Sequence, residues 1–257
     1  MSFKTLVLIF HAALLLLTVI YFLLPVDVWP YYVLIALFFG GLAYGAANVC
    51  SGMYIKSLCR GTDQQKAIAI TFDDGPSQYT PAVLDILAAY NVKATFFCVG
   101  KAAEAYPGIV KRIHAEGHII GNHSFSHHAL FDFFRANKMT ADLSKTHATM
   151  EQLISKKLRL FRPPYGVTNP ALARAVKRLN YLSIGWSLRS FDTLKWKNEK
   201  TLARLERKLK AGDITLFHDN RKNCPELVKS FIEMALARQF EIKSLDLLLD
   251  IHPYHDQ

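Results

Sequence analysis

From residue 67 onward, short apolar runs alternate with longer amphipathic segments, and this alternation limits the possible folds more than any other feature. A strand followed by a helix, repeated along the chain, produces a parallel sheet with helices packed outside it. We therefore predict an α/β fold, an irregular (β/α) barrel of about seven strands. The predicted strands cover 67–72, 94–99, 118–120, 158–162, 181–186, 213–218 and 240–243. The predicted helices cover 81–90, 102–116, 139–155, 170–179, 199–210 and 225–238.

Two adjacent carboxylates, Asp73 and Asp74, follow the first apolar run and precede Gly75-Pro76. Neighbouring side chains on a strand point to opposite faces, and like charges this close are costly unless a cation or a shared proton relieves them. The pair therefore predicts one metal ligand and one acid/base group at the mouth of the sheet. An exposed acidic turn is the simpler alternative, because Asp-Gly is a common turn dipeptide.

His123 and His127 are four residues apart. On one helical turn they would share a face, which is the geometry that places two metal ligands together in other hydrolases. One of the two aspartates would supply the third ligand and leave a position open for water. Ordinary surface or core histidines are the alternative, and His128 leaves open which imidazoles bind.

Two prolines separate Arg162 from Tyr165 after the run 158–161. Proline fixes its own backbone and restricts the residue before it, so these side chains should be aimed rigidly from a strand end. An arginine at such a position can hold a carboxylate by a bidentate contact. A rigid surface loop is the alternative interpretation.

Two more apolar segments end on groups capable of chemistry, at Asp192 and at His218-Asp219. The His218 imidazole can act as a general acid, tuned by a neighbouring carboxylate. Barrel enzymes place their active sites at the carboxyl ends of the strands. The pattern therefore predicts an active site at one end of the barrel.

Taken in order, these motifs resemble those of the NodB-homology polysaccharide deacetylases, carbohydrate esterase family 4, over about residues 67–249. The resemblance implies that Asp73 is the catalytic base. It also implies one divalent metal, zinc, with cobalt or nickel as alternatives, held by Asp74, His123 and His127. The implied activity is hydrolysis of carbon–nitrogen bonds other than peptide bonds, which removes N-acetyl groups from an amino-sugar polysaccharide or oligosaccharide.

The resemblance assigns further roles. It implies that Arg162 and Asp192 orient the base, and that the backbone amide of Tyr165 helps to hold the oxyanion. Leu216 would line the acyl pocket, and His218 would be the general acid. Two alternatives stay open: a deacylase of a lipid-linked amino sugar at the membrane surface, and a catalytically silent carbohydrate-binding membrane protein.

One motif departs from the family pattern. Many members carry an aspartate three residues before the Asp192 position and a tryptophan directly after it, whereas this chain has Arg189 and Thr193 there. Trp186 and Trp196 flank the segment without an obvious replacement role. In the family, the missing tryptophan forms part of an aromatic wall of the sugar groove. The departure therefore bears on which substrate binds more than on the reaction.

The amino terminus carries two uncharged apolar runs of nineteen residues, 6–24 and 31–49. Each approaches the ~20 residues that span a bilayer as a helix. We predict a two-helix transmembrane hairpin over 1–50, a juxtamembrane linker over 51–66, a catalytic domain over 67–250 and a tail over 251–257. A cleaved signal peptide is the alternative for the first run, but that run is long and no small-residue cleavage site follows it.

Charge around the hairpin predicts its orientation. Lys4 precedes the first run, the turn between the runs has no lysine or arginine, and Lys56, Arg60 and Lys66 follow the second run. The positive-inside rule then places the catalytic domain of this multi-pass protein on the cytoplasmic face, although most relatives act on polymers outside the cytoplasm.

The chain carries a formal net charge of +10. The basic run 204–210 is typical of a solvated helix face, and attraction to membrane lipids is the alternative. We find no nucleic-acid-binding motif. The four cysteines, Cys50, Cys59, Cys98 and Cys224, show neither metal-binding spacing nor a disulfide framework.

Overall fold

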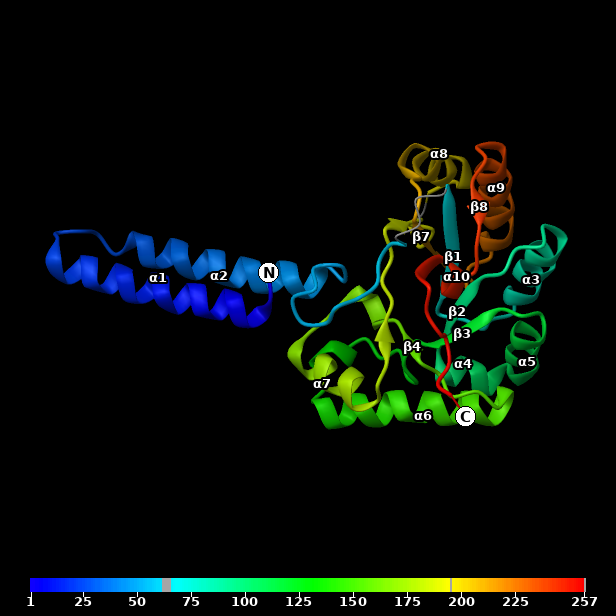
Figure 1. Ribbon diagram of the computed structural model, residues 1–257, viewed down its shortest axis with the longest axis horizontal. Helices are drawn as coiled ribbons and strands as arrows, with labels where there is room; N and C mark the ends of the chain where they lie inside the picture. The colour runs from blue at the N-terminus through cyan, green and yellow to red at the C-terminus, as the bar shows by residue number, and fades with distance from the viewer. Residues whose placement is uncertain (62–65, 195, 257) are drawn as a thin grey trace.

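The computed structural model describes residues 1–61, 66–194 and 196–256. Residues 62–65 of the predicted linker and residue 257 of the predicted tail lie outside the described residues. Figure 1 shows two parts, a pair of long helices that projects as an arm and an α/β unit that carries the rest of the chain. The chain therefore consists of an apolar helical segment and an α/β unit, as its composition predicts.

The arm consists of α1 (Phe3–Leu23) and α2 (Trp29–Ala47), which lie side by side (Figure 1). Phe10 and Phe38 stack between them with ring centroids 4.2 Å apart. Most of their apolar side chains are exposed, since only 6% of each apolar window is buried. Both helices are long and apolar enough to cross a membrane, and the same properties fit a signal sequence.

The α/β unit is built on parallel strands in the order β5-β4-β3-β2-β1-β7-β6, with β8 paired to β1. This half-barrel is the predicted fold class. The strands are β1 (Ala67–Asp73), β2 (Thr95–Cys98), β3 (Ile119–Asn122), β4 (Leu160–Phe161), β5 (Leu182–Ser183), β6 (Leu188–Arg189), β7 (Ile214–His218) and β8 (Glu241–Ile242).

Helices and short 3-10 turns connect the strands. They are α3 (Thr80–Ala89), α4 (Gly100–Ala105), α5 (Pro107–Ala115), η1 (Phe131–Phe133), α6 (Ala136–Ile154), η2 (Pro164–Gly166), α7 (Pro170–Arg178), α8 (Asn198–Lys208), α9 (Cys224–Ala237) and α10 (Leu245–Leu249). The single helix predicted over 102–116 is wrong: two helices meet at Pro107, which has no amide hydrogen to continue the first. The strand predicted over 181–186 is likewise only β5, and β6 follows it.

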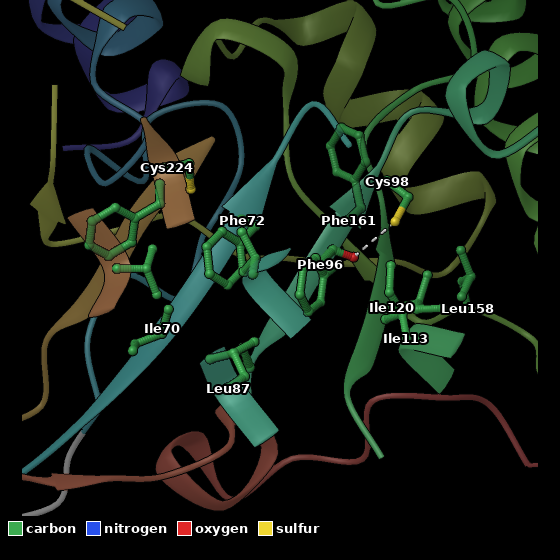
Figure 2. Packing of buried hydrophobic residues seen from close by; sticks show 14 of the residues in the cluster. Ile70, Phe72, Leu87, Phe96, Cys98, Ile113, Ile120, Leu158, Phe161 and Cys224 are labelled. Carbon is green, nitrogen blue, oxygen red and sulfur yellow. Dashed lines mark hydrogen bonds between the residues drawn. The ribbon is translucent and has the colours of Figure 1, made fainter. Parts of the chain in front are cut away.

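The core lies between the central strands and the outer helices. β1 is buried along its whole length because strands flank it and helices cover it. Phe72 of β1 stacks on Phe96 of β2 (Figure 2), and their ring centroids are 4.8 Å apart. Phe217 of β7 packs edge-on against Phe231 of α9. This packing fixes the ends of β1 and β7, where the predicted catalytic groups begin.

The segment after the arm adds to the barrel itself. Leu58 donates its amide hydrogen to the carbonyl of Ser183 and accepts one from Gly185, both at 2.9 Å. Further along, Gly61 donates to Gly212 at 2.8 Å. A disulfide that the sequence analysis missed joins Cys50 to Cys59. The end of the arm is therefore fixed to the α/β unit by backbone pairing and by a covalent link.

Candidate active site

Asp73 ends β1 and is held by a wholly buried arginine. Nη1 of Arg162 lies 2.8 Å from Oδ1 of Asp73 and 2.8 Å from Oγ1 of Thr71. The same guanidinium donates to the carbonyl oxygens of Ile184 at 3.2 Å and Gly185 at 2.8 Å. Four fixed partners leave Arg162 one orientation, and this arginine holds the Asp73 carboxylate, which is only 3% exposed, in place. The contact that the sequence indicated between Arg162 and a carboxylate is present, through one nitrogen.

Asp74 faces the two predicted imidazoles. Its Oδ1 lies 3.5 Å from Nε2 of His123 and 3.2 Å from Nε2 of His127. One ligand atom from each of these three residues lies within 4.8 Å of the others. Nδ1 of His123 lies 2.9 Å from the carbonyl oxygen of Arg162, which directs Nε2 toward Asp74. One carboxylate and two imidazoles with an open side suit a divalent catalytic metal.

The two histidines reach this position from a loop, so the interpretation as a helical turn is wrong. They follow β3, and Ser124 and His127 have left-handed backbone, with φ of 66° and 41°. Hydrogen bonds to the loop amides stabilise it: Oδ1 of Asn122 accepts from Ser124 at 2.9 Å, and Oδ1 of Asp142 accepts from Phe125 at 2.7 Å. His128, the third candidate imidazole, is exposed and lies outside the cluster.

The electrostatics of the cluster favour a charged carboxylate. Burial by itself would raise the pKa of Asp74, but the hydrogen bond and charge of His123, with smaller contributions from His127 and His218, hold that pKa well below its usual value. Burial by itself would lower the pKa of His123, yet the charges of Asp73 and Asp74 raise it. In this buried cluster the imidazoles compensate the charge of the carboxylates. A bound cation would supply the same compensation.

His218, at the end of β7, is held by Asp192. Its Nδ1 lies 2.7 Å from Oδ1 of Asp192, and its backbone amide donates to Oδ2 at 2.8 Å. Burial by itself would lower the pKa of His218, but the hydrogen bond and charge of Asp192 raise it above its ordinary value. The resemblance implied that Asp192 orients the base; instead it contacts the imidazole.

Asp219 does not tune His218, although it is its neighbour in sequence. Consecutive residues near a strand end point to opposite sides, so the Asp219 side chain turns toward Thr80, whose hydroxyl donates to Oδ2 at 2.6 Å. Burial raises the pKa of Asp219 to about 7. The carboxylate that tunes His218 thus comes from a segment 26 residues away.

The catalytic groups surround one cavity of about 180 Å³, lined by Asp73, Asp74, His123, His127, Tyr165, Gly166, Trp186, Arg189, Thr193, Leu216, His218 and Arg221. Leu216 and Tyr165 therefore both line this cavity, and the roles that the resemblance implies for them stay predictions. Tyr165 has left-handed backbone, φ 58°, and its hydroxyl donates to the carbonyl of His127 at 3.2 Å.

Sequence reasoning missed three residues at this site. Trp186 gives the cavity the aromatic wall that the motif departure had put in doubt, whereas Trp196 packs on Phe191. Arg221 lines the cavity just beyond the His218-Asp219 pair, and no motif marks it. Thr71 shares the Arg162 guanidinium with Asp73. Of these three residues, only Thr71 could have been found from the sequence. It precedes Asp73 by two residues and therefore lies on the same face of β1.

Comparison with known proteins agrees with this arrangement. The family model for polysaccharide deacetylase matches residues 60–184. A peptidoglycan-N-acetylglucosamine deacetylase of Bacillus cereus is 35% identical over 180 residues, which cover 67% of this chain and 81% of the relative. A solved structure of a peptidoglycan N-acetylglucosamine deacetylase superposes with a TM-score of 0.71 at 28% identity, covering 77% of this chain and 94% of the other.

The chain belongs to the polysaccharide deacetylases, carbohydrate esterase family 4, whose enzymes are hydrolases of carbon–nitrogen bonds other than peptide bonds. Its structural neighbours include a family pseudoenzyme from Bacillus anthracis, with a TM-score of 0.70 at 25% identity over 76% of this chain and 69% of the other. The fold alone therefore does not establish catalysis, and activity in this chain depends on the site residues.

Proposed function

We propose that this protein is a metal-dependent deacetylase that removes N-acetyl groups from an amino-sugar substrate. The observation that carries the proposal is one cavity that joins a positioned carboxylate, a three-residue metal site and a carboxylate-bound imidazole. The relative from Bacillus cereus, named for deacetylation of peptidoglycan N-acetylglucosamine, supports the substrate class. Zinc suits the mixed oxygen and imidazole ligands of Asp74, His123 and His127, with cobalt or nickel as alternatives.

The residues divide the reaction between them. Asp73, oriented by Arg162, takes the proton of the attacking water. His218, whose pKa is raised by the hydrogen bond and charge of Asp192, donates a proton to the departing amine. The metal, when bound, supplies Lewis-acid polarisation of the amide carbonyl. The backbone amide of Tyr165 completes the oxyanion site, and Leu216 receives the methyl group of the acetyl.

We further propose that α1 and α2 anchor the protein in a membrane. The disulfide favours the outer face for the catalytic domain, because disulfides persist in oxidising compartments and are rare in the cytoplasm. The lysine and arginine distribution predicts the opposite face. However, Arg60, one of the residues behind that prediction, pairs with the buried carboxylate of Asp213 at 2.5 Å. The charge of Arg60 is therefore paired within the α/β unit. We accordingly propose that the catalytic domain faces outward, as the disulfide indicates.

Acetate release tests the proposed activity. We expect purified full-length protein loaded with zinc to release acetate from N-acetylated glucosamine oligosaccharides, and Asp73→Asn to release none while still binding metal. Binding of the oligosaccharide by the zinc-loaded wild type without acetate release would instead support the silent carbohydrate-binding protein. The exposed His128→Ala, outside the metal cluster, is the matched control and should retain activity.

A further inference from the structure

A second cavity, of about 330 Å³, lies beside the catalytic one and shares Trp186 and Arg189 with it. The end of the arm, from Ala47 to Cys50, also lines it, as do Ser187, Phe191 and Arg204. A substrate bound across Trp186 and Arg189 would therefore occupy both cavities. The second cavity plays no part in the chemistry proposed above.

Two arginine side chains that line this cavity, Arg189 and Arg204, have no carboxylate partner among the described residues. Cζ of Arg189 lies 5.2 Å from the centroid of the Phe191 ring, and Cζ of Arg204 lies 4.4 Å from it. Nη1 of Arg204 donates to the carbonyl oxygen of Arg189, which holds the two residues together. Nε of Arg189 is buried without a hydrogen-bond partner, and neither guanidinium pairs with a carboxylate within the described chain. Paired guanidinium groups are the side chains best suited to bind a phosphate.

The arm places this cavity at a defined height above a membrane. α2 has 19 residues and is therefore about 28 Å long, close to the ~30 Å hydrocarbon core of a bilayer. The end of the arm is fixed beside the catalytic cavity. Thr168 donates its amide hydrogen to Ala46 in the last turn of α2 at 3.0 Å, and Sγ of Cys50, just after α2, lies 3.2 Å from the carbonyl oxygen of Trp186, which lines that cavity. If α2 spans the membrane, the second cavity lies at the level of the lipid headgroups.

We propose that the second cavity binds the phosphate of an amino sugar linked through phosphate to a membrane lipid, through Arg189 and Arg204, and that the sugar then lies in the catalytic cavity. This inference rests on the proposed function. The lipid tail stays in the bilayer beside α2, the phosphate meets the two guanidinium groups at the interface, and the N-acetyl group reaches Asp73 and the metal site. The arginine three residues before Asp192 therefore becomes a determinant of substrate choice.

The test compares two lipids in nanodiscs that hold the full-length, zinc-loaded protein. One is polyprenyl-phosphate N-acetylglucosamine, and the other carries the same sugar on the same lipid through a neutral glycosidic bond. We expect kcat/KM to be about tenfold or more higher for the phosphate-linked lipid, the size of effect that a charge-assisted hydrogen bond gives. Arg204→Gln should remove most of this preference, and Arg204→Lys should restore part of it.

Arg207→Gln is the matched control, because Arg207 is exposed on the same helix and does not line the second cavity. It should leave the preference and the activity unchanged. Thermal unfolding at the wild-type temperature would show that Arg204→Gln is folded. Equal kcat/KM for the two lipids, or a preference for soluble peptidoglycan fragments over both, would overturn the lipid-phosphate site and leave the deacetylase proposal standing.

A binding measurement separates the two proposals. The Asp73→Asn variant should bind the phosphate-linked lipid more tightly than the neutral one, and Arg204→Gln in that background should abolish the difference. If the wild type released no acetate from any substrate, the proposed deacetylase activity would be refuted. The difference in binding between the two lipids would still show whether the second cavity binds phosphate. Equal binding of both lipids by Asp73→Asn would refute the phosphate site independently of catalysis.

Discussion

Asp192 holds His218 at two points, through the imidazole Nδ1 at 2.7 Å and through the backbone amide at 2.8 Å. One carboxylate therefore fixes both the ring and the strand end that carries it. His218 also lines the catalytic cavity, so its Nε2 is left for the proposed protonation of the leaving amine. Arg162 fixes Asp73 on the neighbouring strand in a comparable way. The proposed acid and base thus have separate, buried partners that hold them in position.

Replacement of Asp192 by asparagine should shift the pH profile of the enzyme. The hydrogen bond and charge of Asp192 raise the pKa of His218, and a general acid is active only below its pKa. Without that charge the pKa falls, so the alkaline limb of the kcat profile should move to lower pH. Steady-state rates between pH 5 and 10 measure this. An unchanged alkaline limb would mean that another group donates the proton.

Loss of the imidazole itself should slow the reaction without loss of metal. His218→Ala should reduce kcat by roughly 10²–10⁴-fold, the usual contribution of a general acid. Elemental analysis should still find about one metal per chain, because His218 lies outside the ligand cluster. Loss of metal from this variant would reassign His218 to the metal site.

The metal ligands should be separable from their neighbours. The double variant His123→Ala, His127→Ala should lose the metal, and Asp74→Asn should bind it more weakly, because these residues supply the ligand atoms. His128→Ala should keep full occupancy. Elemental analysis after gel filtration distinguishes these results, and full occupancy in the double variant would exclude the assigned ligands.

The Arg162–Asp73 pair should matter for stability as well as for rate. Arg162 is fully buried, so Arg162→Met leaves Asp73 without its charged partner, and loss of one member of a buried ion pair costs about 3–5 kcal/mol. Denaturant unfolding should show a lower free energy of unfolding. Wild-type stability in Arg162→Met would show that Asp73 is solvated or compensated by another group.

The side of the membrane can be measured directly. A cysteine introduced at Asp256, near the exposed carboxyl end, should react with an impermeant thiol reagent in intact cells if the domain faces outward, as the disulfide indicates. The free cysteines, Cys98 and Cys224, are buried and give a low background. Labelling only after permeabilisation would support the cytoplasmic orientation that the charge distribution predicts.

Much of the fold and the site followed from the sequence, because both depend on local patterns. Alternation of apolar and amphipathic segments predicted the parallel half-barrel, and motifs at the strand ends predicted which residues meet. Asp73, Asp74, His123, His127 and His218 do line one cavity. The carboxyl ends of parallel strands meet at one edge, so this convergence is a consequence of topology that the sequence already specifies.

Tertiary structure alone decided which groups pair. Asp192 contacts His218 rather than Asp73, and Asp219 turns away to Thr80, because side-chain direction depends on backbone geometry that residue order does not show. The Cys50–Cys59 disulfide closes a short loop where the arm meets the barrel, and the second cavity forms there between segments far apart in the chain. The sequence by itself determined the chemistry available at the site. Only the packing of distant segments determined which partner tunes each group and which charges remain unpaired beside it.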